Sequence, residues 1–229
     1  MKARKLDHIA IYMRDRASAA DFLTSYLGFH VVDHTERYTL VGAGGRLGKL
    51  TLFDAPEGTE PGTGEIERIT LRVTDVPSAV KRLPDEAMAE GNGSGKALFT
   101  GPEGLSLALV HDGTAADYDL EGITLRSDDP EGAAEAFVAM GFEPTEDATS
   151  VAAGEYRLRL VEGASDGGGM LFHLGCLVDS AEEHRKEAES RGMKVQNFVE
   201  GPNTLAVFVL GPGNVSVEYV EHKPGFSLE

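Results

Sequence analysis

The stretch Leu6-Asp7-His8-Ile9-Ala10-Ile11-Tyr12, with the amphipathic segment 17–26 and the tripeptide Leu27-Gly28-Phe29 after it, sets the pattern for the whole chain. The first run is typical of a β-strand and the second of a helix that buries one side. Gly28 suits the left-handed position just past a helix end. Three short strand-like runs follow, at residues 31–32, 38–41 and 49–53. The first quarter of the chain is therefore predicted to fold as a β-α-β-β-β unit.

The same order occurs three more times. Strand-like runs at 67–73, 121–125 and 172–178 precede predicted helices at 76–90, 130–140 and 181–191. The spacing from the first strand to the glycine that ends the helix is 19 or 20 residues in three units, namely His8 to Gly28, Gly122 to Gly141 and His173 to Gly192. Ser78, Pro130 and Ser180 are the predicted helix start signals. Such regular recurrence indicates four tandem modules of about fifty residues.

Two modules close with nearly the same turn. Gly101-Pro102-Glu103-Gly104 and Gly211-Pro212-Gly213-Asn214 each fix a tight turn before a last strand, and seven residues after the turn begins stand Ala108 and Glu218. The acidic, glycine-containing stretch 112–119 is a natural seam, which divides the chain into residues 1–113 (modules one and two) and 114–229 (modules three and four).

Composition restricts the function. Lys plus Arg number 21 and Asp plus Glu number 38, so the formal net charge is −17. Such a charge disfavours binding to nucleic acid or to anionic membrane surfaces. Cys176 is the sole cysteine, which excludes an intrachain disulfide and favours a reducing compartment. No apolar run approaches the ~20 residues of a membrane span, and we expect a soluble cytoplasmic protein, either a monomer or a homodimer.

Four tandem βαβββ modules of this size resemble the vicinal-oxygen-chelate superfamily of glyoxalases, bleomycin-resistance proteins and type I extradiol dioxygenases. The Leu-Asp-His-Ile-Ala-Ile opening, the Gly-Phe after helices and the Gly-Pro turns carry the resemblance across the chain. It implies an α+β fold in which the modules form two cupped mixed sheets. It also implies that metal ligands come from the first and last strands of the modules.

The resemblance assigns candidate metal ligands by position. First-strand positions hold His8, Arg68, Gly122 and His173, and last-strand positions hold about Leu52, Ala108, about Arg159 and Glu218. The metal-competent residues among them are His8, His173 and Glu218. Two imidazoles and a carboxylate with open positions form the triad suited to non-haem Fe(II). Ligands drawn from modules one and four resemble those of hydroquinone-type ring-cleaving dioxygenases.

Other positions depart from those dioxygenases. Asp7 stands where they have a second histidine, Phe208 where they have a tyrosine, and Gly201 or Pro202 where they have an arginine. Phe208 is then a candidate for the wall of the substrate pocket. Strand alternation also makes Tyr12 and His222 candidate acid-base groups, because they share faces with His8 and Glu218.

The resemblance thus implies a ring-cleaving, extradiol-type dioxygenase that acts on a catechol- or hydroquinone-like compound and O₂. Fe(II) is the favoured metal, with Mn(II), Zn(II) and Ni(II) as alternatives. Two other functions stay open: a glyoxalase-like isomerase or lyase that keeps the metal, and a metal-free binding protein of the bleomycin-resistance type that sequesters a small ligand.

Overall fold

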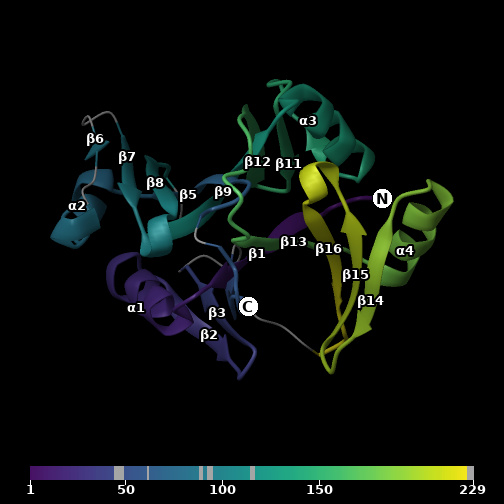
Figure 1. Ribbon diagram of the computed structural model, residues 1–229, viewed down its shortest axis with the longest axis horizontal. Coiled ribbons are helices and arrows are strands. Elements are labelled where there is room, and N and C mark those ends of the chain that lie inside the picture. The colour runs from purple at the N-terminus through teal and green to yellow at the C-terminus, as the bar shows by residue number, and fades with distance from the viewer. Residues whose placement is uncertain (44–48, 61, 88–89, 92–94, 114–116, 226–229) are drawn as a thin grey trace.

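Four βαβββ modules follow one another along the chain, coloured from purple to yellow in Figure 1. The computed structural model describes residues 1–43, 49–60, 62–87, 90–91, 95–113 and 117–225. Module 1 comprises β1 (Lys5–Met13), α1 (Arg16–Tyr26), β2 (His30–His34), β3 (Tyr38–Gly42) and β4 (Lys49–Asp54). Module 2 comprises β5 (Ile66–Val73), α2 (Val76–Val80), η1 (Asp85–Ala87), β6 (Glu90–Gly91), β7 (Lys96–Thr100), η2 (Pro102–Gly104) and β8 (Ser106–His111).

Modules 3 and 4 repeat this order. Module 3 comprises β9 (Tyr118–Ser127), α3 (Pro130–Ala139), β10 (Glu143–Pro144), β11 (Ser150–Ala153) and β12 (Tyr156–Glu162). Module 4 comprises β13 (Leu171–Leu177), α4 (Ala181–Ser190), β14 (Val195–Glu200), β15 (Thr204–Leu210), η3 (Pro212–Asn214) and β16 (Ser216–His222). The predicted module order is confirmed.

The helix of module 2 is much shorter than predicted. It ends at Val80 instead of continuing to residue 90, of which 88 and 89 lie outside the described residues. Pro84 lacks a backbone N–H and disfavours a helical conformation at the residue before it, so the helix cannot continue through this point.

The N-cap of each helix stands seven residues after the equivalent position of the preceding strand, which is His8 in module 1. The N-cap side chains accept a hydrogen bond from the backbone N–H three residues on, and they belong to Asp15, Asp75, Asp129 and Ser180. Ser78 is therefore not the cap of α2, as the sequence suggested, because its backbone N–H donates to Asp75.

The strands form two mixed sheets, each built from two modules. One sheet has the order β14-β15-β16-β13-β1-β4-β3-β2, and the other the order β10-β11-β12-β9-β5-β8-β7-β6. At the centre of the first sheet β1 pairs antiparallel with β13, as the purple and green strands of Figure 1 show. At the centre of the second sheet β5 pairs antiparallel with β9. The predicted α+β fold with two cupped mixed sheets is confirmed.

The sheets do not follow the predicted division at residues 113 and 114. Each sheet takes one module from each half, because modules 1 and 4 pair with each other and modules 2 and 3 do likewise. The first strand of every module would otherwise be a sheet edge with unpaired backbone groups, and pairing with another first strand satisfies them. Residues 114–116, at the predicted boundary, are not described.

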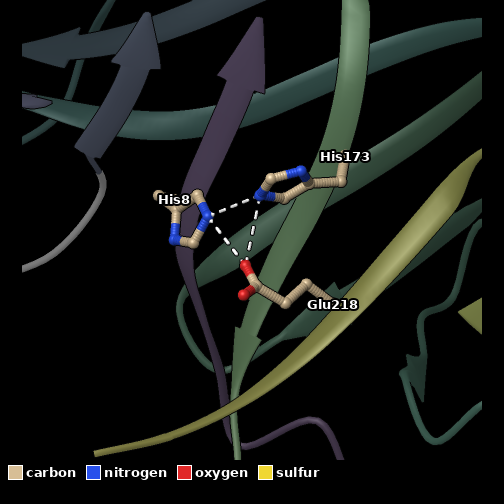
Figure 2. Close-up of side chains that lie close together, drawn as sticks. All are labelled: His8, His173 and Glu218. Carbon is tan, nitrogen blue, oxygen red and sulfur yellow. Dashed lines mark hydrogen bonds and ion pairs between the residues drawn. The ribbon is translucent and has the colours of Figure 1, made fainter. Parts of the chain in front are cut away.

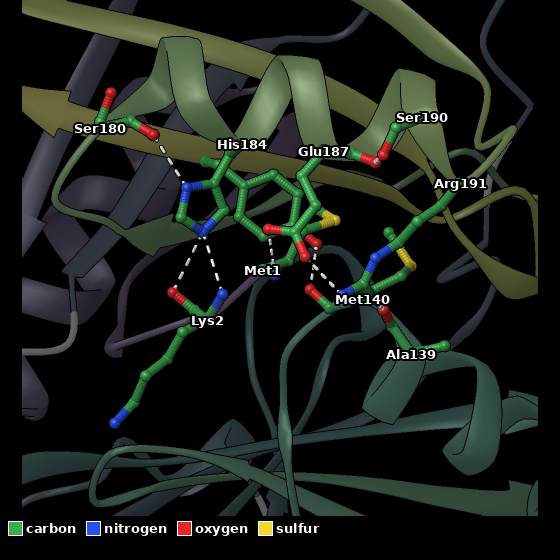
Figure 3. A network of polar contacts seen from close by, with 10 residues as sticks. Met1, Lys2, Ala139, Met140, Ser180, His184, Glu187, Ser190 and Arg191 are labelled. Atoms are coloured by element: carbon green, nitrogen blue, oxygen red, sulfur yellow. Dashed lines mark hydrogen bonds and ion pairs between the residues drawn. The ribbon is translucent and has the colours of Figure 1, made fainter.

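The segment before β1 ties modules 1, 3 and 4 together (Figure 3). The backbone N–H of Lys2 lies 3.1 Å from Nε2 of His184 on α4. Ala3 N–H donates to the Gly141 carbonyl just after α3. Arg191, at the end of α4, donates to the last carbonyl of α3. These contacts anchor the segment that leads into β1, the strand that pairs with β13. In the described part of the chain, no helix has the length and apolar character needed to cross a bilayer.

Candidate metal centre

Irregularities in the central strand pair aim adjacent side chains into the cup of the first sheet. In the β1–β13 register, Leu6 pairs with Cys176 and His8 with Gly175, so Asp7 is an extra residue on β1. Such a β-bulge breaks the alternation of faces and commonly occurs beside functional sites. Consequently both Asp7 and His8 line the same cavity. Strand alternation alone would have sent Asp7 to the opposite face.

A second bulge lies on the partner strand. Ala10 pairs with His173 and Ile11 with Leu171, which leaves Phe172 extra on β13. Phe172 and His173 therefore both line the cavity, as Asp7 and His8 do. The central strand pair thus presents two histidines, each preceded by a bulged residue, to one concave surface.

The three predicted ligands meet at one point, although they come from opposite ends of the chain (Figure 2). Nε2 of His8 lies 2.9 Å from Nε2 of His173, and each of these nitrogens lies 3.1 Å from Oε2 of Glu218. All three side chains are mostly buried, at 13%, 5% and 12% exposure respectively. The structure therefore brings together two imidazoles and a carboxylate, each offering one ligand atom.

Protons alone cannot satisfy this triangle of atoms. Each Nε2 carries at most one hydrogen, and the carboxylate oxygen only accepts, so at least one of the three edges has no hydrogen bond. A cation at the centre would be bound by all three lone pairs. Ligands about 2.1 Å from an ion lie about 3.0 Å apart on an octahedral face and about 3.4 Å apart in a tetrahedron. The observed edges fit the octahedral face, which leaves further coordination positions open.

The fourth ligand position of this cup holds a threonine. Glu218 pairs in register with Gly175, two residues beyond His173. The equivalent pair in module 1 is Ala10 and Thr51, so the last-strand position is Thr51 and not Leu52, as the sequence had placed it. A neutral hydroxyl is not a usual ligand for a divalent transition metal. This cup therefore offers three candidate ligands among its described residues.

The second cup contains no equivalent cluster among its described residues. Its four corresponding positions are occupied by Arg68, Ala108, Gly122 and Arg159. Arg159 instead forms a bidentate ion pair with Glu121, with N–O distances of 2.7 and 2.8 Å. The two sheets share one architecture, but among the described residues a cluster that could chelate an ion was found in the first sheet alone.

A buried ion pair, Asp7 and Lys49, contacts His8 at the ring nitrogen that faces away from the other two candidate ligands. Oδ2 of Asp7 lies 3.0 Å from Nδ1 of His8, and Oδ1 accepts a hydrogen bond from Lys49 Nζ at 3.2 Å. Asp7 and Lys49 are only 4% and 5% exposed. This carboxylate keeps a hydrogen on Nδ1, so that Nε2 is the nitrogen that offers its lone pair when the ring is neutral. Lys49 in turn compensates the charge of the carboxylate.

The surrounding charges shift the ionisation of the ligands. Burial opposes a charged His8, but hydrogen bonds with Asp7 and Glu218 outweigh it and raise the pKa of His8 to about 9. Burial would raise the pKa of Glu218, but hydrogen bonds from His173 and His8 hold it at about 2. Burial lowers the pKa of His173, so this ring is neutral. Its Nδ1 has no hydrogen-bond partner among the described residues.

Gly175 makes room for the first ligand. A Cβ atom at this position would lie 2.3 Å from Cε1 of the His8 ring, which is closer than real atoms approach. The ring of His8 therefore rests directly on the backbone of β13. The need for a glycine is steric here, since the backbone of Gly175 is not left-handed.

The cluster opens into a cavity of about 630 Å³, lined on one side by aromatic rings. Phe172 and Phe53 pack edge to face at 5.0 Å, and Tyr38 lies 5.9 Å from Phe53. Phe208 faces His173 with ring centroids 5.3 Å apart. Such walls fit a flat, largely apolar ring whose polar groups reach the ligand cluster.

The other predicted site residues lie in different places. Phe208 and His222 both line the cavity, and His222 Nε2 is 4.0 Å from Asp7 Oδ1. Tyr12 stacks on Phe172, and it lines a separate, much smaller cavity. Cys176 is fully buried, as predicted. The sequence did not point to Lys49 or Thr51, because only strand register places these residues beside the ligands.

The comparisons with known proteins agree with this fold. The sequence profile of the Glyoxalase/Bleomycin resistance protein/Dioxygenase superfamily matches residues 5–219, which is nearly the whole chain. The chain belongs to this superfamily. As a member, it has the four-module form of the fold, with the His8, His173 and Glu218 cluster between modules 1 and 4. No curated protein matches it in sequence.

Solved structures share the fold of this superfamily member at low identity. A protein from Bacillus subtilis subsp. subtilis strain 168, provisionally named a dioxygenase, is 18% identical with a TM-score of 0.73, over 98% of this chain and 87% of that one. Glyoxalase I from Zea mays is 15% identical with a TM-score of 0.71, over 95% and 92%. The cppA protein from Streptococcus pneumoniae TIGR4 is 14% identical with a TM-score of 0.61, over 95% and 99%.

Proposed function

We propose that this protein is a non-haem Fe(II)-dependent dioxygenase that cleaves the ring of a catechol- or hydroquinone-like compound. The observation that supports it best is the ligand set: two histidines and one glutamate in a facial arrangement, with Thr51 at the fourth position. Non-haem iron oxygenases use such a triad because it leaves room for more than one further ligand.

His8, His173 and Glu218 would hold the metal. Bound Fe(II) would supply adjacent positions for a substrate hydroxyl and O₂, and a route for electron density between them. The walls formed by Phe172, Phe53 and Phe208 would then hold the ring in place and exclude water. His222, at the cavity wall, is our candidate to accept a hydroxyl proton. Tyr12 is not assigned this role, because it lines the separate small cavity.

The overall reaction balances without another reductant. One ring C–C bond breaks, both atoms of one O₂ enter the product, and the four electrons that reduce O₂ come from the ring. A dioxygenase of this type therefore consumes one O₂ for each ring opened and needs no nicotinamide or flavin.

The rival functions make different demands on the site. A glyoxalase-like isomerase or lyase would keep a metal, and the resemblance to glyoxalases implies four protein ligands for it, whereas the described residues of this cup offer three. A bleomycin-resistance-type protein would bind its ligand without metal. Its cavity would therefore work equally well after loss of the ligand cluster.

Oxygen uptake tests the proposal directly. Anaerobically purified protein loaded with Fe(II) is mixed with a panel of catechols and hydroquinones, and O₂ consumption and ring-opened product are measured together. We expect one O₂ per product, loss of activity in Glu218→Gln, and normal activity in His111→Ala, which alters an exposed histidine of the second sheet. Activity on a hemithioacetal without O₂ uptake would instead favour the isomerase, and metal-independent binding of a ligand would favour the sequestering protein.

A further inference from the structure

The cavity wall includes one arginine, Arg37, whose guanidinium has no acidic partner among the described residues. In this acidic chain most arginines do have such partners. The arginines that form an ion pair with a described acidic residue are Arg4, Arg14, Arg16, Arg68, Arg72, Arg126, Arg159, Arg185 and Arg191. Two further described arginines, Arg82 and Arg157, also form no ion pair, but neither lines this cavity. Arg37 is therefore a cation that lines the cavity and has no acidic partner among the described residues.

The hairpin that carries Arg37 is held rigid from two sides. Oγ1 of Thr35 accepts hydrogen bonds from the backbone N–H groups of Arg37 and Tyr38, at 3.2 and 3.1 Å. Arg16, on α1, donates to the carbonyls of Thr35 and Glu36 at 3.4 Å. Because the tip between β2 and β3 is braced in this way, the backbone that carries Arg37 is held in place beside the cavity before any ligand binds.

The neighbours of Arg37 leave its charge available. The Tyr38 hydroxyl donates to Asp33 at 2.7 Å, so the polar group of the residue next in sequence already has its partner. The carboxylates of the cavity, Asp7 and Glu218, are engaged by His8, His173 and Lys49. Among the described residues, the cavity lining includes no carboxylate besides these two, and Gln196, Asn197 and Asn214 contribute neutral polar groups.

We infer that the substrate carries an anionic substituent, such as a carboxylate, at the end of the ring away from its metal-binding hydroxyls, and that Arg37 binds this group. The inference rests on the proposed function, since it assumes a diol bound at the His8, His173 and Glu218 cluster. The guanidinium fork matches a carboxylate with two parallel hydrogen bonds between opposite charges, which are stronger than hydrogen bonds to a neutral substituent. Arg37 is then a specificity residue, and the substrate class is an acidic aromatic diol.

Binding of matched ligand pairs tests this assignment. Anaerobic Fe(II)-loaded protein is titrated calorimetrically with catechol and with hydroquinone, each with and without an acetate arm, in wild type, Arg37→Gln, Arg37→Lys and Arg157→Ala. Arg157 is an exposed arginine of β12 without an ion pair, so it controls for the loss of one positive charge.

We expect the acetate arm to improve binding to wild type by about tenfold, a modest gain because Arg37 is exposed. Arg37→Gln should lose this preference while its affinity for the unsubstituted diol changes less than about twofold. Arg37→Lys should retain part of the preference, and Arg157→Ala all of it. Rising salt should weaken the preference in wild type.

The failures are distinguishable. If both members of each pair bind equally to wild type, or if Arg37→Gln keeps the preference, the role of Arg37 is refuted while the dioxygenase proposal stands. If no diol binds the Fe(II)-loaded wild type, the proposed function is refuted and the inference about Arg37 with it.

Discussion

Asp7 and His8 are consecutive residues of one strand, yet both side chains line the same cavity, and the Asp7 carboxylate lies 3.0 Å from Nδ1 of His8. The β-bulge at Asp7 makes this contact possible. Regular alternation would have separated the two side chains by the thickness of the sheet. The bulge therefore gives His8 a fixed tautomer and presents its Nε2 to His173 and Glu218.

Replacement of Asp7 by asparagine should weaken metal binding about 10- to 100-fold, because the carboxylate that orients His8 is lost. The measurement is the affinity for Zn(II) or Fe(II), by competition with a chromophoric chelator. An unchanged affinity in Asp7→Asn would show that His8 is oriented by its packing alone.

Lys49, which donates a hydrogen bond to Asp7, provides a second test, based on the free energy of unfolding. Asp7→Asn leaves the ammonium of Lys49 buried without its carboxylate, which should cost roughly 3–5 kcal/mol of unfolding free energy. The double variant Asp7→Asn/Lys49→Met removes both charges and should regain much of that loss. Chemical denaturation of the metal-free proteins measures both values. A double variant less stable than Asp7→Asn would contradict the pairing.

Gly175→Ala should displace the His8 ring, since the new methyl group would lie 2.3 Å from Cε1. We expect at least a tenfold loss of metal affinity with only about 1–3 kcal/mol of lost stability. Gly113→Ala is the matched control, because nothing lies within 4 Å of the added atom there. Equal metal affinity in the two variants would mean that His8 can move without consequence.

Metal binding should release protons. Hydrogen bonds with Asp7 and Glu218 overcome burial and hold the pKa of His8 at about 9 in the metal-free protein, so this ring is protonated at pH 7. A metal must displace that proton, and affinity should therefore rise about tenfold per pH unit up to about pH 9 and then level off. Titration calorimetry at pH 7 in buffers of different ionisation enthalpy should count about one proton released. A pH-independent affinity would be inconsistent with the charged state of His8.

The raised pKa of His8 also makes the stability of the metal-free fold depend on pH. A raised pKa means that folding favours protonated His8, so this contribution to stability is complete below pH 6.5 and is lost as pH rises towards 9.

Cys176 should be unreactive in the native state. Burial raises the pKa of its thiol, helped by the negative charges of Asp7 and Glu218, so the thiolate is scarce even at pH 8. A chromogenic disulfide reagent at pH 8 should modify it only in denaturant. Rapid labelling of the native protein would reveal an opening of the β1–β13 region that the packing does not suggest.

Much of the architecture is predictable because it repeats. Glycines follow three helices, Gly-Pro turns precede the last strand of two modules, and the N-caps stand seven residues after the equivalent strand position in all four. The ligand cluster could be predicted from the same positions, since His8, His173 and Glu218 are the metal-competent residues in them. Only the resemblance to known proteins indicated that modules 1 and 4 would meet.

The remaining features of the site could not be predicted, because no local sequence signal indicates them. The bulges at Asp7 and Phe172 interrupt alternation without a glycine or proline to signal them. Thr51, rather than Leu52, occupies the fourth ligand position because of the parallel register of β1 and β4. Arg37 reaches the cavity through the placement of a hairpin tip, which strand patterns do not determine. Location in the cytoplasm and the oligomeric state stay predictions.

The central claim is that residues from the first and last modules hold one ion, and the metal content of matched variants tests it most directly. Anaerobically reconstituted wild type and His111→Ala should each retain about one equivalent of Fe(II) after desalting, whereas His8→Ala and His173→Ala should retain almost none. Full metal content in His8→Ala, or no bound metal in wild type, would contradict the claim.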